Sequence, residues 1–162
     1  MTATVSTPSS SAIARVLSGL VGKDVTPQNG TRVPIGGGAS TVCGVCAHDG
    51  QEGLVALWAC DLKITCHAGA ALAMIPEDVA EECVDEKDIP RNIFENFGEI
   101  LNVLTPLLNN PGSPRVKLVR VYGPGEELPA EVGDLAGNAG SHLDVKLDIQ
   151  GYSGGCITLY FG

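Results

Sequence analysis

Four polar side chains, spaced three or four residues apart, share one face of a helix predicted near the middle of the chain: Asn92, Glu95, Glu99 and Asn102. At this spacing side chains are neighbours on a helix surface. A solvated helix face usually carries Lys at positions that pair with Glu, whereas this stripe consists of carboxylates and amides. An amide both donates and accepts hydrogen bonds, and its charge does not change with pH. The stripe is a candidate functional surface, with a merely polar helix face as the alternative.

The opposite face of this helix is apolar, at positions that recur with the helical period. It carries Ile93, Phe97, Ile100, Leu101, Leu104 and Leu108. Asp88 is the expected cap, with Pro90 in the first turn. Pro106 lacks an N–H and leaves the Asn102 carbonyl without its helical partner. Either a kink beside Asn102 or a frayed last turn is compatible with that residue.

Composition limits the classes of function. The 162 residues fit one domain, expected to span residues 11–162 after a disordered tail at residues 1–10. The net charge of −9 argues against nucleic acid or an anionic membrane as a partner. Acidic residues concentrate between Glu77 and Glu99, where a solvated surface and a docking surface for a Lys-bearing partner are both open interpretations.

Localisation is expected to be cytoplasmic. No apolar run is long enough to span a bilayer, and the N-terminus does not have the basic residues of a secretory signal. The six cysteines are therefore expected to be free thiols.

Hydrophobic periodicity and turn residues predict an α+β domain, an antiparallel sheet of about six strands with helices packed on it. The expected order is helix, strand, hairpin, two helices, long helix, strand and hairpin. The expected strands are residues 24–33, 41–48, 54–60, 116–122, 142–150 and 156–161. The expected helices are residues 12–20, 61–74, 76–84 and the long helix from Asp88 to about residue 108. Residues 36–38 (Gly-Gly-Gly) are expected to be a flexible joint, and residues 123–140 a loop.

The residues Glu99–Ile100–Leu101–Asn102 read E-x-x-N, and this motif resembles that of the CheC/CheX/FliY chemotaxis phosphatases. The fuller family pattern places an acidic residue or Ser four residues before the Glu, and a Pro about two dozen residues after the Asn. Glu95 and Pro124 match these places, with Glu at the first and Pro124 one residue closer than the family spacing. The order of predicted elements also resembles the CheX/CheC fold over nearly the whole chain, so the closest resemblance is to CheX-like proteins.

The resemblance implies a phosphatase that removes phosphate from the aspartyl-phosphate of a CheY-like response-regulator receiver domain. Asn102 would orient the attacking water, Glu99 would pair with a Lys of the receiver, and Glu95 would be a secondary partner contact. The phosphorylated receiver would supply Mg²⁺, so no cofactor of the chain's own is expected. CheX-like proteins pair through their sheets, and the alternating strand at residues 142–150 is a candidate for a homodimer contact.

Two other functions remain open from the sequence. The first is a non-catalytic binding module on the same CheC-like fold, as in the flagellar switch proteins that resemble this family. The second is a ligand-binding structural protein that uses the loop at residues 123–140.

Three further patterns are interpreted as structural. Cys43 and Cys46 lie three apart on a predicted strand, so they point to opposite faces and cannot chelate one ion, and no metal site is expected. Residues 151–155 match the hydrolase motif G-x-S-x-G, but a strand rather than a helix follows and no His comes after Ser153. The three histidines are scattered and are expected to be surface or hydrogen-bonded structural residues.

Overall fold

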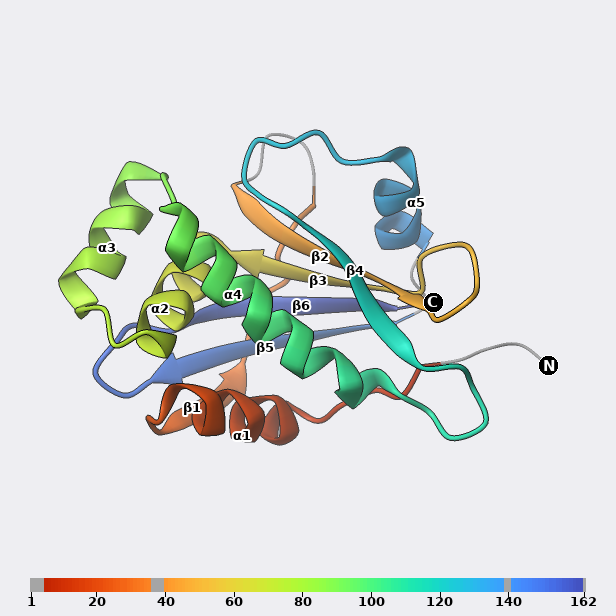
Figure 1. Ribbon diagram of the computed structural model, residues 1–162, viewed down its shortest axis with the longest axis horizontal. Coiled ribbons are helices and arrows are strands. Elements are labelled where there is room, and N and C mark those ends of the chain that lie inside the picture. Colours follow the sequence, from red (N-terminus) through yellow and green to blue (C-terminus); the bar gives the residue numbers. More distant parts are fainter. Residues whose placement is uncertain (1–4, 36–39, 139–140, 162) are drawn as a thin grey trace.

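A computed structural model describes residues 5–35, 40–138 and 141–161. In these residues the chain forms a six-stranded antiparallel sheet in the order β1-β5-β6-β3-β2-β4 (Figure 1). The strands are β1 (Val25–Asn29), β2 (Thr41–His48), β3 (Ala56–Asp61), β4 (Val116–Tyr122), β5 (Ser141–Ile149) and β6 (Gly155–Phe161). The helices are α1 (Ser10–Val21), α2 (Leu62–Leu72), α3 (Glu77–Glu86), α4 (Arg91–Leu104) and α5 (Ala130–Asn138), with a 3-10 turn η1 (Thr105–Leu108).

The helices lie on both faces of the sheet in unequal numbers. Helices α1, α2 and α4 cover one face and bury the main core with Trp58, and α3 packs on α2 at the end of this layer (Figure 1). The other face carries a smaller cluster in which Val132 of α5 packs with Leu57 and Tyr160. Within the described ranges, no helix combines the length and apolar character that crossing a bilayer requires.

Helix α4 has the predicted phase, because each of its predicted core residues is at most 1% exposed. It packs closely on α2, where a Cβ on Gly69 would lie 2.6 Å from the Ile93 carbonyl oxygen. The side-chain amide of Asn96 donates to the Gly69 carbonyl oxygen at 3.1 Å. The contact with α2 therefore fixes which face of α4 points to solvent.

Local capping residues delimit α1 and begin α2, whereas the predicted cap of α4 is wrong. The Ser9 hydroxyl accepts from the Ala12 N–H, and Gly22 ends α1 with φ +69°. The Asp61 carboxylate accepts from the Ile64 N–H at 2.8 Å. Helix α4 instead begins at Arg91 after Pro90, without a side-chain cap.

The structure corrects three further expectations. Residues 123–140 do not form only a loop, because they contain α5, whose few apolar residues gave a weak periodic pattern. Strand β1 ends at Asn29 rather than at Val33. From Val5 on the predicted tail lies against the core, and the Ser6 N–H donates to the Leu108 carbonyl at 2.8 Å. Residues 1–4 and the Gly-Gly-Gly joint at residues 36–38 lie outside the described residues.

Strand β5 is inside the sheet, with β1 on one side and β6 on the other. Its alternation is as predicted, since Val145, Leu147 and Ile149 are buried. The strand at residues 142–150 therefore cannot offer a free edge to a second copy. The two edge strands of the sheet are β1 and β4.

Candidate functional site

The outward face of α4 presents two of the predicted site residues without local partners. Glu99 and Asn102 are exposed, and neither side chain has a hydrogen bond or ion pair among the residues that the structure describes. They lie one turn apart on the same face, so both can contact one partner molecule. An exposed amide and carboxylate held on a packed helix are suited to recognition of a second protein.

Glu95 differs from Glu99 and Asn102, because its carboxylate already pairs with a cationic side chain of the same helix. Its Oε1 accepts from Nε of Arg91 at 2.9 Å, and the two side chains are four residues apart on α4. The interpretation of the stripe as free of basic partners is therefore wrong at its N-terminal end. The spacing of Arg91 and Glu95 was visible in the sequence.

Asn102 lines a hollow of about 140 Å³ between the C-terminal end of α4 and strand β4. The residues that line it are Asp49, Asn102, Thr105, Pro106, Arg115, Val116, Lys117 and Leu118. Lys117 Nζ lies 3.2 Å from Asp49 Oδ1. Two cations, one carboxylate and one amide thus surround a space large enough for several water molecules or a phosphoryl group.

A buried hydrogen-bond network fixes the helix end below this hollow. The Thr105 hydroxyl donates to the Leu101 carbonyl oxygen at 2.7 Å and accepts from the indole N–H of Trp58 at 3.2 Å. The helix changes to the 3-10 turn η1 at Thr105, with Pro106 at its start. The local effect of Pro106 is therefore this change of helix type at the end of α4, and Asn102 is held on a well-anchored backbone.

Pro124 is not among the residues that line the hollow at Asn102. It lines a separate hollow of about 340 Å³ with Arg91, Phe94 and Glu126, at the N-terminal end of α4. The structure therefore brings Glu99 and Asn102 together on one helix face and leaves Pro124 at the other end of that helix.

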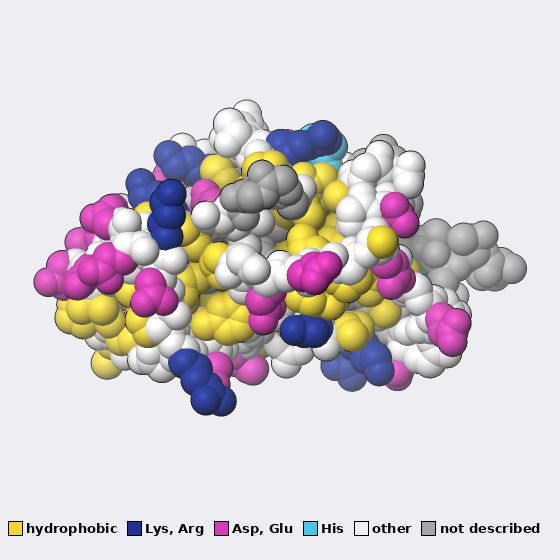
Figure 2. Space-filling view, turned by 90° about the horizontal axis from the view of Figure 1, so that it is seen from above, with side chains coloured by type: hydrophobic (Ala, Val, Ile, Leu, Met, Phe, Trp, Pro, Cys, Tyr) yellow, Lys and Arg dark blue, Asp and Glu magenta, His cyan; other side chains and the backbone are white. Residues whose placement is uncertain are grey.

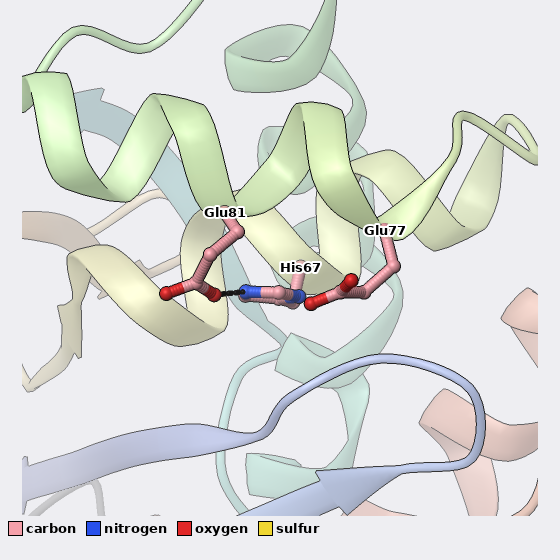
Figure 3. A group of neighbouring side chains, drawn as sticks. All are labelled: His67, Glu77 and Glu81. Carbon is pink, nitrogen blue, oxygen red and sulfur yellow. Dashed lines mark hydrogen bonds and ion pairs between the residues drawn. The ribbon is translucent and has the colours of Figure 1, made fainter.

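A second polar cluster lies between α2 and α3, where Glu77 and Glu81 bracket the ring of His67 (Figure 3). These are residue types that ligate metals. The His67 ring is fully buried, and its Nδ1 accepts from the Ser153 N–H at 3.2 Å. Because the backbone N–H can only donate, Nε2 carries the proton and donates to Glu81 Oε2 at 2.8 Å. Both ring nitrogens are engaged, so the cluster is a hydrogen-bonded joint between α2, α3 and the β5–β6 turn.

The remaining motifs have structural positions, and one histidine has an unpaired ring nitrogen among the described residues. Cys43 and Cys46 belong to the cores on opposite faces of the sheet, as predicted. Ser153 lies in the hairpin turn between β5 and β6, also as predicted. His48 is buried and donates from Nδ1 to the Pro114 carbonyl at 2.9 Å, but its Nε2 has no partner within the described part of the chain. The expectation of a hydrogen-bonded structural histidine is met at Nδ1 of His48, whereas Nε2 is left unpaired among the described residues.

Burial also determines the chemistry of the thiols. It raises the pKa of Cys43 and of Cys46 from 9.0 to about 12. It raises the pKa of the Cys66 thiol from 9.0 to about 12 as well. Among the described residues, all six cysteines are free thiols, and Cys156 alone is partly exposed.

Sequence reasoning missed Asp49, Arg115 and Lys117. Lys117 lies in the strand predicted at residues 116–122 and Arg115 comes directly before that strand, so their spacing of two residues is that of side chains on one side of a strand. Their approach to Asn102 depends on the pairing of β2 with β4, two strands separated by nearly seventy residues of sequence. No local pattern contains that information.

Comparison with known proteins gives likenesses in structure and none in sequence. No protein-family model matches the chain, and no curated protein matches it. A chain in the crystal structure of the CheX–CheY–BeF3–Mg²⁺ complex from Borrelia burgdorferi superimposes with a TM-score of 0.51 at 14% identity, covering 92% of each chain.

Two H. pylori structures are similar to the same degree. A chain of the FliM–SpeE complex has a TM-score of 0.52 at 14% identity, covering 94% of this chain and 80% of that one. A chain of the FliG–FliM complex has a TM-score of 0.50 at 10% identity, covering 94% of this chain and 85% of that one. At these identities the likeness establishes the fold alone. The chain has the α+β fold of the CheC/CheX/FliY type that the sequence predicted.

Proposed function

We propose that this protein is a phosphatase for the aspartyl-phosphate of a CheY-like receiver domain. The observation that carries the proposal is the exposed pair Glu99 and Asn102, one turn apart on a rigid helix, with the Asn102 amide at a polar hollow. The fold shared with a chain of a CheX–CheY complex supports it.

In this mechanism Asn102 orients the water that attacks phosphorus. Its amide donates to one oxygen while its carbonyl accepts from water, and neither function depends on pH. Glu99 anchors a lysine of the receiver, and the exposed position of both residues makes them accessible to a macromolecular substrate. Mg²⁺ belongs to the receiver. Phosphoryl transfer depends on positioning and charge neutralisation more than on new covalent chemistry, so this small set of groups is sufficient.

The alternative is a non-catalytic binding module that docks a partner through the same face. The likeness to chains in two FliM complexes favours it as strongly as the CheX–CheY likeness favours catalysis. In that case Glu99 is a contact residue and Asn102 has no effect on the lifetime of a phosphorylated receiver.

A dephosphorylation assay separates the two functions. Receiver domains phosphorylated with a small-molecule phosphodonor are mixed with wild type, Asn102→Ala and the matched control Asn92→Ala, an exposed Asn on the same helix. Asn102→Ala is expected to slow hydrolysis about 10²-fold, or roughly 3 kcal/mol of barrier, because one positioned group is lost. Asn92→Ala should match wild type.

Partner binding provides the second readout. Asn102→Ala should keep its affinity for the receiver, whereas Glu99→Lys should weaken binding because it places like charges together. Equal hydrolysis by Asn102→Ala and wild type, or no activity of wild type on any receiver tested, rejects the phosphatase in favour of the binding module.

Two further expectations stay proposals. A homodimer through the sheet would have to use an edge, β1 or β4, or a sheet face, and size measurement at high protein concentration tests it. A cytoplasmic location remains a prediction from the sequence.

A further inference from the structure

The backbone of Arg115 is held by a hydrogen bond, whereas its side chain has no partner among the described residues. Its carbonyl oxygen accepts from the Asp49 N–H at 2.7 Å. The following residue, Val116, donates its N–H to the side-chain oxygen of Asn109 at 2.8 Å. These bonds hold the chain just before β4, while the Arg115 side chain is exposed and lines the same hollow as Asn102.

The other two basic side chains of residues 115–120, those of Lys117 and Arg120, already have partners. Lys117 pairs with Asp49. Arg120 lies 3.8 Å from a Glu126 carboxylate oxygen, and its guanidinium is 4.3 Å from the centre of the Tyr122 ring. Arg115 has no ion pair anywhere in residues 5–35, 40–138 and 141–161. Its guanidinium therefore keeps all its donors for a ligand.

The side chains that line the hollow at Asn102 differ in charge balance from the chain as a whole. The chain has 19 acidic and 10 basic residues. Acidic side chains gather at the end of the molecule where α3 lies (Figure 2). The hollow at Asn102 instead has two cations, Arg115 and Lys117, against the single carboxylate of Asp49. In a protein of this net charge, a hollow lined by two cations and one carboxylate repels an anion less than the acidic end of the molecule does.

We infer that Arg115 is a catalytic residue that binds the phosphoryl oxygens beside Asn102; this inference rests on the proposed phosphatase function and deepens it. A guanidinium matches phosphate oxygens with paired N–H donors, and charge-assisted bonds of this kind are about twice as strong as neutral ones. Donors that meet the charge of a phosphoryl group in its transition state accelerate the transfer.

The reaction balances without a further reactant. The oxygen of the water held by Asn102 forms a bond to phosphorus as the bond from phosphorus to the aspartyl oxygen breaks. The aspartyl group leaves as a carboxylate. Both protons of the water stay with the released dihydrogen phosphate ion. Arg115 donates hydrogen bonds throughout and changes neither its charge nor its protonation.

The first test needs no receiver and uses inorganic phosphate as the probe. At low ionic strength, phosphate is titrated while NMR follows the side-chain amide of Asn102, assigned by its loss in Asn102→Ala. Phosphate should shift this signal saturably in wild type. Arg115→Gln should weaken the binding at least about fivefold, because a charged donor is lost. The matched control Arg120→Gln, on the same segment, should leave it unchanged.

The second test uses the phosphorylated receiver. Arg115→Gln should lower the hydrolysis rate at saturating protein at least about tenfold, a larger factor than its effect on binding of the phosphorylated receiver, because the group acts mainly on the transition state. Arg115→Lys should restore part of the rate. A purely structural role would move the unfolding midpoint, which should stay at the wild-type value.

The outcomes separate this inference from the function on which it rests. If wild type is active and Arg115→Gln matches it in rate, the inference is overturned and the phosphatase stands. If wild type hydrolyses no receiver, the phosphatase is rejected and Arg115 is not catalytic. Binding of phosphate that is identical in wild type and Arg115→Gln also overturns the inference.

Discussion

The His67 cluster and the hollow at Asn102 are two polar sites on the same layer of helices, and they differ in whether their groups are satisfied. In the first, Glu81 and the Ser153 N–H occupy both nitrogens of a fully buried ring. In the second, Asn102 and Arg115 are exposed and have no side-chain partner among the described residues.

This difference matters more than residue type. A His between two Glu is the pattern that a search for metal or acid–base chemistry selects first. Its hydrogen bonds join α2, α3 and the β5–β6 turn. An amide and a guanidinium are less conspicuous in a sequence, yet they are the groups with free hydrogen-bonding capacity, so a partner can form new hydrogen bonds with them.

The contrast between buried and exposed groups also applies to the cysteines, and the largest effect that we expect is on the reactivity of the buried thiols. A pKa of about 12 in place of 9.0 lowers the thiolate fraction of Cys43, Cys46 and Cys66 at pH 8 about a thousandfold. The thiolate is the reacting form, and burial also excludes the reagent. Labelling of the native protein with a disulfide reagent should therefore give one fast thiol, Cys156, and slow reaction of the rest.

The control is Cys156→Ser, which should remove the fast phase and leave the slow one. Raising the pH should speed the slow phase, because deprotonation of these thiols increases toward their pKa. Two or more fast thiols in the wild type would mean that the interior opens far more easily than the packing implies.

The next effect is on stability, at His67. His67→Ala leaves a cavity and removes the acceptor of the Ser153 N–H, and it should lower the free energy of unfolding by about 2–4 kcal/mol. Asn102→Ala should change it by less than about 0.5 kcal/mol, because the side chain is exposed and Ala favours the helix. Urea unfolding at constant m-value measures both.

A loss below about 1 kcal/mol for His67→Ala would contradict the structural role of the cluster. His67→Gln is the companion variant, because its amide oxygen can accept from Ser153 and its amide N–H can donate to Glu81. It should recover part of the loss.

Much of the fold follows from local sequence patterns, for reasons visible in particular residues. The apolar stripe from Ile93 to Leu104 matches the helical period, and the residues 145, 147 and 149 match the strand period, so both were assigned correctly. Ser9 and Gly22 delimit α1 because a cap and a left-handed glycine are local chemistry. Helix α5 was missed because only Val132 is fully buried, so its pattern was weak.

The site was predictable only in the part that lies on one helix. Glu99 and Asn102 are three residues apart, and their common face follows from helix geometry. Arg115 comes to Asn102 through the position of β4 at the edge of the sheet, which is set by strand order. The satisfied state of His67 depends on Ser153, 86 residues away in the sequence. Contacts between residues so far apart in the chain produce no periodic pattern in the sequence.

The smallest effect concerns Arg91 and Glu95, the exposed pair at the N-terminal end of α4. A double-mutant cycle with Arg91→Gln and Glu95→Gln should give a coupling of about 0.3–0.5 kcal/mol that fades at high salt, as for other exposed pairs at this spacing. If Glu95 is a secondary contact for a cationic group of the receiver, that group competes with Arg91 for the carboxylate. Arg91→Gln should then tighten receiver binding slightly, by about twofold, while Glu95→Gln loosens it by a similar factor. Equal affinity of both variants and wild type would remove Glu95 from the partner surface and confine that surface to Glu99, Asn102 and the adjoining hollow.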